Sequence, residues 1–177
     1  MQAEHLATER VQQVLHVSRQ ATRGIRPQKI QTIIKEAVKL IRASIPSSIE
    51  IESWIDPGCA PVMADPTQIH QIVMNLCTNA FHAIKESKGM LSIKLIQTHT
   101  DDESFQEKVM IKPGPYAMIE ISDTGCGMSR DTIEKIFNPY FTTKSVGEGT
   151  GLGLSVVHGI VKDLDGEITV VSETGKG

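Results

Sequence analysis

One long amphipathic segment, residues 65–86, constrains the fold more than any other stretch of the chain. Pro66 after Asp65 is typical of a helix start, with an aspartate N-cap and proline as the first helical residue. Apolar residues then recur three and four positions apart, which is the spacing of one helix face: Ile69, Ile72, Val73, Leu76, Ala80, Ala83 and Ile84. The segment therefore predicts a single long helix that packs on a core along one side.

A polar stripe runs beside the apolar face of this predicted helix. Asn75, Asn79 and His82 follow helical spacing, roughly 110° around the helix axis from the centre of the apolar face. Amides are weak helix formers and are unfavourable when buried without hydrogen-bond partners. The stripe is either a pair of satisfied interfacial amides or the edge of a binding site, and the helix alone leaves both interpretations open.

Composition is that of an ordinary soluble globular domain. The 177 residues are 40% hydrophobic and 22% charged, and the net charge of −3 argues against a dedicated nucleic-acid binder. Three cysteines without CxxC spacing favour a reducing compartment, and no apolar run approaches the length of a membrane span. We expect a cytoplasmic domain that itself contacts neither nucleic acid nor membrane, whether or not its parent protein is membrane-anchored.

The start of the chain shows a second helical pattern. Residues 3–20 place small and apolar side chains in four-three-four steps, the spacing of a helix–helix seam, until Gly24 and Pro27 interrupt it. This seam has no obvious partner elsewhere in the sequence. We interpret residues 3–20 as half of a helical hairpin that belongs to a longer protein.

The next part of the chain alternates between helix and strand patterns. A helix is expected over residues 28–45, and strands over 49–54 and 60–63 lead into the long helix. Trp54 is the only tryptophan, and we interpret it as a packing residue.

Three more strands are expected after the long helix. Residues 90–99 and 116–122 alternate apolar and polar side chains around a polar connection, which predicts an antiparallel hairpin with a long tip. Residues 167–172 are expected to form the last strand.

The second strand of the hairpin leads directly into the sequence DTGCGM. Asp123 lies at the end of an apolar strand, where its carboxylate can accept a hydrogen bond from an exocyclic amine such as that of adenine. Gly125 and Gly127 would let the backbone approach a flat ligand closely. An ordinary Asp-Thr-Gly turn is the alternative interpretation.

Residues 129–149 combine aromatic residues, glycines and Pro139 with little periodicity beyond a short helix expected at 130–137. The segment is too apolar for a free linker and too irregular for a core element, which favours a mobile loop that closes over a ligand. Lys144 is the cation that we would place on a phosphate, and a solvated surface lysine is the alternative.

A glycine-rich turn follows and leads into an apolar helix. Free backbone N–H groups and the positive end of the helix dipole then point at one place, which is typical of an anion site. The spacing matches neither a P-loop nor a dinucleotide GxGxxG motif after a strand. The glycines alternate along the turn: Gly147, Gly149, Gly151 and Gly153.

Four stretches occur in order and at compatible spacing: QIVMNLCTNA, DTGCGM, IFNPYFTTK and GEGTGLGLSVV. Together they resemble the N, G1, F and G2 boxes of the ATP-binding catalytic domain of bacterial sensor histidine kinases, relatives of gyrase B, Hsp90 and MutL. The resemblance covers about residues 28–177. In such kinases a helical hairpin carries the phosphorylated histidine on its first helix, and residues 3–20 resemble the second.

The resemblance implies an α/β (α+β) two-layer sandwich, with a mixed, largely antiparallel sheet packed on three helices. It also implies two parts in this chain. Residues 1–24 would be the remnant of the dimerisation hairpin, and residues 25–177 would be the catalytic domain with a mobile lid at about 129–149.

The resemblance implies ATP and Mg²⁺ as cofactors and gives roles to matching residues. Asn79, together with Asn75, would coordinate Mg²⁺, and His82 occupies a position often held by a cation near the phosphates. Asp123 would bind the adenine amine. Further nucleotide-binding residues would come from the glycine loops and the lid: Gly125, Gly127, Met128, Thr142, Thr143, Lys144, Thr150, Gly151, Leu152, Gly153 and Leu154.

Asn75 discriminates between branches of this superfamily. In the ATP-hydrolysing branch, a glutamate one turn before the magnesium asparagine serves as general base for water. An amide at this position cannot take a proton at neutral pH. The implied reaction is phosphoryl transfer to a histidine, with Asn75, Asn79 and Lys144 as the catalytic residues.

The sequence lacks a histidine acceptor motif, so autophosphorylation of this chain alone is not expected. It also ends before the strand that usually follows the final glycines, and we expect a piece of a longer protein. The implied partners are a phosphoacceptor and dimerisation helical domain of the same parent protein and the receiver domain of a response regulator. Two alternatives stay open: a nucleotide-sensing interaction module without transfer activity, and a serine kinase or hydrolytic ATPase of the same fold.

Overall fold

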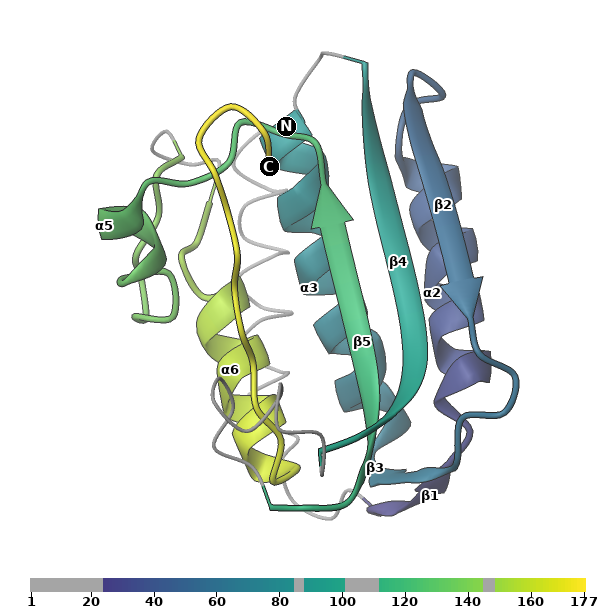
Figure 1. Cartoon of the computed structure of the whole chain (residues 1–177). Coiled ribbons are helices and arrows are strands. Elements are labelled where there is room, and N and C mark those ends of the chain that lie inside the picture. Colours follow the sequence, from purple (N-terminus) through teal and green to yellow (C-terminus); the bar gives the residue numbers. More distant parts are fainter. Residues whose placement is uncertain (1–23, 85–87, 101–111, 145–148) are drawn as a thin grey trace, which may run out of the picture.

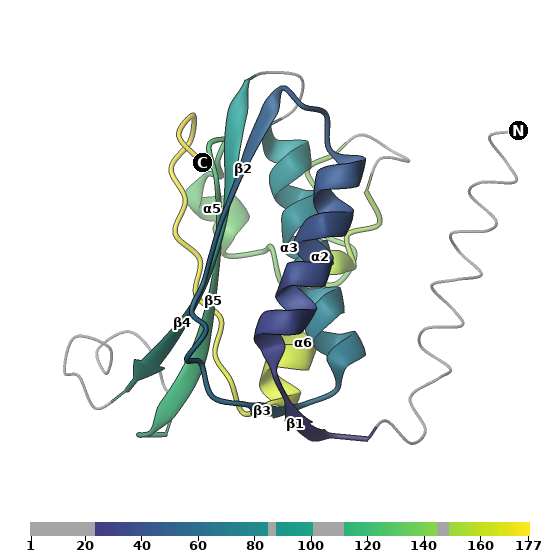
Figure 2. The same cartoon turned by 90° about the vertical axis from the view of Figure 1, so that its right-hand side faces the viewer.

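The fold has two layers, a β-sheet and a layer of helices, which Figure 2 shows edge-on. The structure is a computed structural model and describes residues 24–84, 88–100, 112–144 and 149–177. The helix expected at residues 3–20, and with it the proposed hairpin remnant, lies outside the described residues.

The main sheet has the strand order β2-β4-β5 (Figure 1). Strand β2 (Ile49–Ile55) runs parallel to β4 (Gly89–His99), which pairs antiparallel with β5 (Pro115–Asp123). A separate antiparallel pair joins β1 (Arg26–Gln28) to β3 (Val62–Ala64). The expected antiparallel hairpin and the mixed, largely antiparallel sheet are therefore confirmed.

Three helices cover one face of the sheet: α2 (Ile30–Ser44), α3 (Pro66–Ile84) and α6 (Gly153–Asp163). Helix α3 lies in the middle and contacts both α2 and α6. This arrangement confirms the two-layer sandwich with three helices. Among the described residues, none of the helices is both long and apolar enough to cross a membrane.

The core lies between strand β4 and the helices. Leu91, Ile93 and Leu95 have no exposed surface, because alternate side chains of the strand point toward the helices. They belong to one apolar cluster with Ile34 of α2 and Val73 of α3. Burying one such aliphatic side chain stabilises the fold by about 1.5–3 kcal/mol. This packing fixes α3, and with it the amide stripe, relative to the sheet.

Helix α3 begins as its sequence predicts. The Oδ1 atom of Asp65 accepts a hydrogen bond from the backbone N–H of Thr67 at 2.7 Å, which is an aspartate N-cap, and Pro66 is the first helical residue. Asp65 is only 5% exposed, so the start of the helix is fixed inside the fold.

Trp54 does not pack in the core, and that prediction is wrong. The side chain is 55% exposed, and its strand position pairs with Lys94, on the face of the sheet away from the helices. Lys94 in turn forms a 2.9 Å ion pair with Glu120 on the neighbouring strand. The position of a residue in the strand, rather than its residue type, decides which face of the sheet it occupies.

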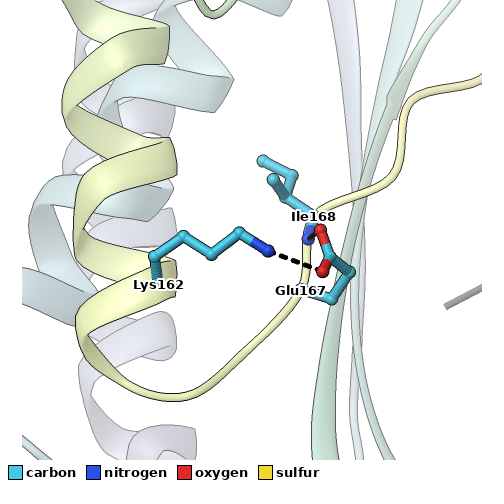
Figure 3. A network of polar contacts seen from close by, with 3 residues as sticks. All are labelled: Lys162, Glu167 and Ile168. Carbon is cyan, nitrogen blue, oxygen red and sulfur yellow. Dashed lines mark hydrogen bonds and ion pairs between the residues drawn. The ribbon is translucent and has the colours of Figure 1, made fainter. Parts of the chain in front are cut away.

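The last expected strand is also wrong. Residues 167–172 run beside β5 but form no strand. From Ile168 to Ser172 half-buried and exposed side chains alternate, so the sequence pattern is that of an extended segment without a backbone ladder. The segment is joined to α6 by its first residue, because Lys162 Nζ lies 2.6 Å from Glu167 Oε2 (Figure 3).

The helix expected at 130–137 is shorter than predicted. Helix α5 (Arg130–Ile133) is capped by Ser129, whose hydroxyl oxygen accepts from the backbone N–H of Thr132 at 3.3 Å. Beyond it the hydrogen bonds tighten to three-residue spacing, as from Lys135 N–H to the carbonyl of Thr132 at 2.9 Å, and turns replace the helix.

Candidate functional site

The amide stripe of α3 faces the first residue of α6. A β-carbon placed on Gly153 would lie 3.6 Å from Oδ1 of Asn75 and 4.0 Å from Nδ2 of Asn79. Both asparagines are half-buried, so they lie at the edge of the helix layer and are not sealed in the core. The stripe therefore forms one wall of a site whose other wall is the N-terminus of α6.

The N-terminus of α6 has the features of an anion site. The N-cap residue, Leu152, provides no side-chain hydrogen bond to the first turn of this helix. The positive end of the helix dipole thus faces Asn75 and Asn79 without a side-chain cap of its own. A phosphate group between the two helices would receive the backbone N–H groups of α6 and the amides of α3 together.

Lys144 reaches the amide stripe from the loop after α5. Its Nζ lies 2.8 Å from Nδ1 of His82 and 3.4 Å from Oδ1 of Asn79. Lys144 is more than sixty residues away in the chain from both Asn79 and His82, which lie together on α3. The structure therefore brings together the residues that the sequence assigned to the phosphates and the metal.

Residues 138–144, in the segment expected to form a lid, pack against residues 149–152 of the glycine-rich turn. The backbone N–H of Tyr140 donates to the carbonyl of Gly151 at 2.9 Å. Both residues have left-handed backbone angles, φ 67° for each, and a β-carbon on Gly151 would lie 2.4 Å from the carbonyl carbon of Tyr140. Glycine at position 151 is thus required by the close approach of the two segments.

Asp123 ends strand β5 and holds the following loop. Its Oδ1 accepts a hydrogen bond from the backbone N–H of Gly125 at 2.8 Å. That loop docks on the last turn of α3, where Cys126 N–H donates to the carbonyl of Ala83 at 3.0 Å. A β-carbon on Gly125 would lie 2.6 Å from the same carbonyl oxygen. The adenine end and the phosphate end of the predicted site are therefore both anchored on α3.

Gly127 and Met128 contact the end of the chain. Gly127 has φ 63°, and a β-carbon there would lie 2.0 Å from the carbonyl oxygen of Glu173. The backbone N–H of Met128 donates to the hydroxyl of Ser172 at 2.9 Å. The close approach at both glycines of DTGCGM is thus to the protein's own backbone, and their contact with a nucleotide stays a prediction.

The remaining predicted residues lie in the lid and at the start of α6. The hydroxyls of Thr142 and Thr150 each accept a hydrogen bond from the backbone N–H two residues later, at 3.2 and 3.4 Å. Thr143 is exposed, Leu152 is the N-cap of α6, and Leu154 is half-buried in the first turn of that helix. Their predicted contacts with nucleotide are not tested by these positions.

One contact at the base of the lid was missed by the sequence analysis. The rings of Phe137 and His158 lie 5.1 Å apart between centroids, which joins the segment before the lid to α6. Helical periodicity alone would place His158 on a face of α6 without indicating a partner. The sequence feature that could have indicated this contact is Phe137, an aromatic residue directly before NPYF whose ring would pack on another segment of the chain.

The residues present fit a hard cation coordinated mainly by phosphate oxygens. In the described ranges, no cluster of three or more His, Cys, Asp or Glu side chains could hold a metal ion. Mg²⁺ typically keeps waters and substrate phosphates and takes few protein oxygens. Asn79 Oδ1 already has a cation beside it, the ammonium group of Lys144 at 3.4 Å. That oxygen is therefore suitably placed for Mg²⁺ together with nucleotide phosphates.

Comparison with known protein families identifies the family to which the chain belongs. A family model described as "Histidine kinase-, DNA gyrase B-, and HSP90-like ATPase" matches residues 64–177. The chain belongs to this ATPase family. The matched range includes all four sequence boxes, α3, the lid and α6. ATP is therefore the nucleotide of this domain.

Relatives of this ATPase domain are named as sensor kinases. Sensor kinase CckA of Brucella abortus (strain 2308) is 38% identical over 170 residues, which cover 94% of this chain and 18% of that protein. Sensor histidine kinase ZraS of Escherichia coli (strain K12) is 36% identical over 149 residues, which cover 84% and 28%. The chain thus spans less than a third of the length of these curated relatives.

A solved structure supports the same relationship. The nucleotide-free catalytic domain of histidine kinase ThkA matches with a TM-score of 0.62 and 29% identity, over 78% of this chain and 80% of that one. The resemblance read from the four boxes is confirmed: the chain is an ATPase domain of the histidine kinase type.

Proposed function

We propose that this domain binds Mg·ATP between α3, α6 and the lid and transfers the γ-phosphoryl group to a histidine outside this chain. The acceptor would lie on the dimerisation helical domain of the same parent protein. A response regulator receiver domain would then take the phosphoryl group. The observation that carries the proposal is the convergence of Asn75, Asn79 and Lys144 at the N-terminus of α6.

Each part of the site has a chemical role in this proposal. Asn79 and Asn75 provide amide oxygens for Mg²⁺, which neutralises phosphate charge when it is bound. The N–H groups of α6 and the ammonium of Lys144 stabilise the charge that develops on the transferred group. Asp123 accepts from the adenine amine with the carboxylate oxygen that Gly125 does not use.

The position of Asn75 favours transfer over hydrolysis. Its Oδ1 lies near the first residue of α6, and the resemblance aligns Asn75 with the water-activating glutamate of the ATP-hydrolysing branch. An amide cannot accept a proton at neutral pH, so this group can orient the phosphates but cannot activate water. Positioning and charge stabilisation are the main demands of phosphoryl transfer to an external nucleophile.

The first test is calorimetry of ATP binding with and without Mg²⁺. We expect Asn79→Ala to weaken Mg·ATP binding by at least about tenfold through loss of a metal oxygen. Thr78→Ala is the matched control, since Thr78 lies on the same helix with an exposed side chain. If the unaltered domain bound neither ATP nor ADP, the proposal would be wrong at its first step.

The second test is transfer of labelled phosphate to the cognate acceptor-helix domain, supplied separately. We expect phosphohistidine on the acceptor and little release of free phosphate. Binding without transfer to a cognate acceptor would favour a nucleotide-sensing module. Steady phosphate release that Asn79→Ala abolishes would favour a hydrolytic ATPase.

A further inference from the structure

Lys144 contacts the amide stripe of α3 directly. The ammonium lies 2.8 Å from a ring nitrogen of His82 and 3.4 Å from the oxygen of Asn79. Lys144 is half-buried although it belongs to a surface loop. The loop is thus tied to α3 at the oxygen assigned to the metal.

The geometry defines what His82 does in this contact. An ammonium group has three N–H donors and no acceptor, so Nδ1 of His82 must be the acceptor of the 2.8 Å hydrogen bond. The ring is then neutral with its proton on Nε2. His82 is on the last turn of α3, one turn after Asn79, so the same helix holds both groups that contact the ammonium.

We propose that His82 is a positioning residue that holds Lys144 over Asn79, so that the lysine ammonium takes the place of the metal until Mg·nucleotide displaces it. The half-buried amide oxygen of Asn79 then lies next to a positive charge both when the lysine ammonium is in place and when Mg²⁺ is bound.

This inference differs from a direct phosphate contact by His82. Nδ1 of His82 accepts from Lys144 and cannot donate to a phosphate, which leaves only the Nε2–H for such a contact. The claim that Mg²⁺ is the competing metal rests on the proposed function, but the contact between Lys144 and helix α3 does not. An experiment can therefore refute one of these claims without refuting the other.

The contact is tested by hydrogen exchange of residues 138–144 and 149–152 in nucleotide-free protein. His82→Phe keeps an aromatic ring without the acceptor, and Lys144→Met keeps the chain length without the charge. We expect each variant to speed exchange in these segments by roughly fivefold to tenfold, the change that one hydrogen bond accounts for. The double variant should exchange no faster than the faster single variant, because both changes remove one shared contact.

Lys39→Met is the matched control for loss of a lysine charge, because Lys39 lies on the exposed face of α2. It should leave lid exchange unchanged. The proposed contact would be overturned if His82→Phe or Lys144→Met exchanged at the rate of the unaltered protein. It would also be overturned if the rate increases of the two single variants multiplied in the double variant.

The competition is tested by the Mg²⁺ enhancement of ADP binding, measured as the ratio of affinities with Mg²⁺ and with a chelator. Because both affinities in the ratio are measured on the same variant, a direct contribution of Lys144 to ADP binding cancels. We expect the ratio to rise about fivefold in Lys144→Met, because no ammonium then competes for Asn79, and to rise less in His82→Phe, because the ammonium is still present but is no longer held beside that oxygen. An unchanged or smaller ratio would overturn the placeholder role. Absence of ADP binding in the unaltered protein would refute the proposed function, while lid exchange would still test the contact.

Discussion

At the scale of single residues, Asp123 carries two separable interactions. One carboxylate oxygen accepts from the backbone N–H of Gly125 at 2.8 Å and thereby shapes the loop. In our proposal the other oxygen accepts from the adenine amine. An asparagine keeps the first acceptor and replaces the second by a donor, so this substitution separates folding from binding.

We predict that Asp123→Asn weakens ATP and ADP binding by at least about tenfold, since it removes a hydrogen bond to a charged acceptor. The melting temperature of the nucleotide-free protein should stay close to that of the parent protein. Calorimetry and thermal unfolding measure the two effects, with Asp131→Asn on the exposed side of α5 as control. A large fall in melting temperature without nucleotide would make the carboxylate structural.

The three cysteines differ in environment, and this predicts their order of reaction. Burial raises the pKa of the Cys77 thiol to about 12, and burial with the nearby Asp56 carboxylate raises the pKa of Cys59. Cys126 is exposed in the loop after β5. Since the thiolate is the reactive form, an alkylating reagent at pH 8 should modify Cys126 first and Cys77 last. Mass spectrometry of timed samples measures the order, and early labelling of Cys77 would contradict its burial.

The sequence was a good guide to residues whose neighbours lie on their own element. The alternation of Leu91, Ile93 and Leu95 predicted their burial because a strand has only two faces. The spacing of Asn75 and Asn79 predicted a common helix edge for the same reason. Lys144 was assigned to the phosphates, but its contact with His82 joins a loop to a helix 62 residues away, and local periodicity carries no information on such a pair.

At the scale of elements, the site depends on how loops dock on α3. Gly125 lies against the carbonyl group of Ala83, and an added β-carbon would be 2.5 Å from that carbonyl carbon. Backbone atoms of a packed helix cannot move aside as a flexible side chain can. The loop that ends β5 is therefore held at a fixed distance from the amide stripe.

We predict that Gly125→Ala destabilises the domain by about 1–3 kcal/mol, the usual range for overpacking. Gly159→Ala is the matched control, because Gly159 lies inside α6 with nothing within 4 Å of an added β-carbon. In a helix interior that substitution should stabilise by about 0.5–1 kcal/mol. Urea unfolding measures both, and equal effects would mean that the loop does not dock on α3 as described.

The sequence predicted the bounds of an element correctly only where backbone pairing and side-chain burial occur together. The hairpin of β4 and β5 was predicted because alternation and a full backbone ladder occur together there. From Ile168 to Ser172 exposed and half-buried side chains alternate without a ladder, so a pattern read from side chains overpredicted a strand. The exposed Trp54 shows the reverse case, a residue type that is usually packed, on the open face of the sheet.

At the scale of the whole molecule, one ion pair joins the helix layer to the segment that runs beside the sheet. Lys162 Nζ on α6 lies 2.6 Å from Glu167 Oε2, and Glu167 Oε1 accepts from the backbone N–H of Ile168 at 3.3 Å (Figure 3). The hydrogen bond from Lys162 is the main cause of a lowered pKa for Glu167, which outweighs the opposing effect of burial. The carboxylate form is therefore favoured by folding.

This lowered pKa predicts how the contribution of Glu167 to stability varies with pH. A group whose pKa falls on folding stabilises fully above its unfolded pKa, and that stabilisation is lost as pH falls through the folded pKa. Glu167→Gln should therefore lower the free energy of unfolding near pH 7 by no more than about 1 kcal/mol, as expected for a partly exposed pair. The difference from the parent protein should shrink below about pH 4.5 and vanish in stronger acid.

Urea unfolding of the parent protein and of Glu167→Gln across this pH range measures the difference directly. Lys162→Met removes the partner, so adding Glu167→Gln to it should lower stability by less than in the parent protein, and with less dependence on pH. A difference that grew toward acid pH would have the wrong sign for a carboxylate held ionised by the fold. Because the pair joins α6 to the segment beside β5, its loss should also speed hydrogen exchange at Ile168 more than at Leu91 in the core.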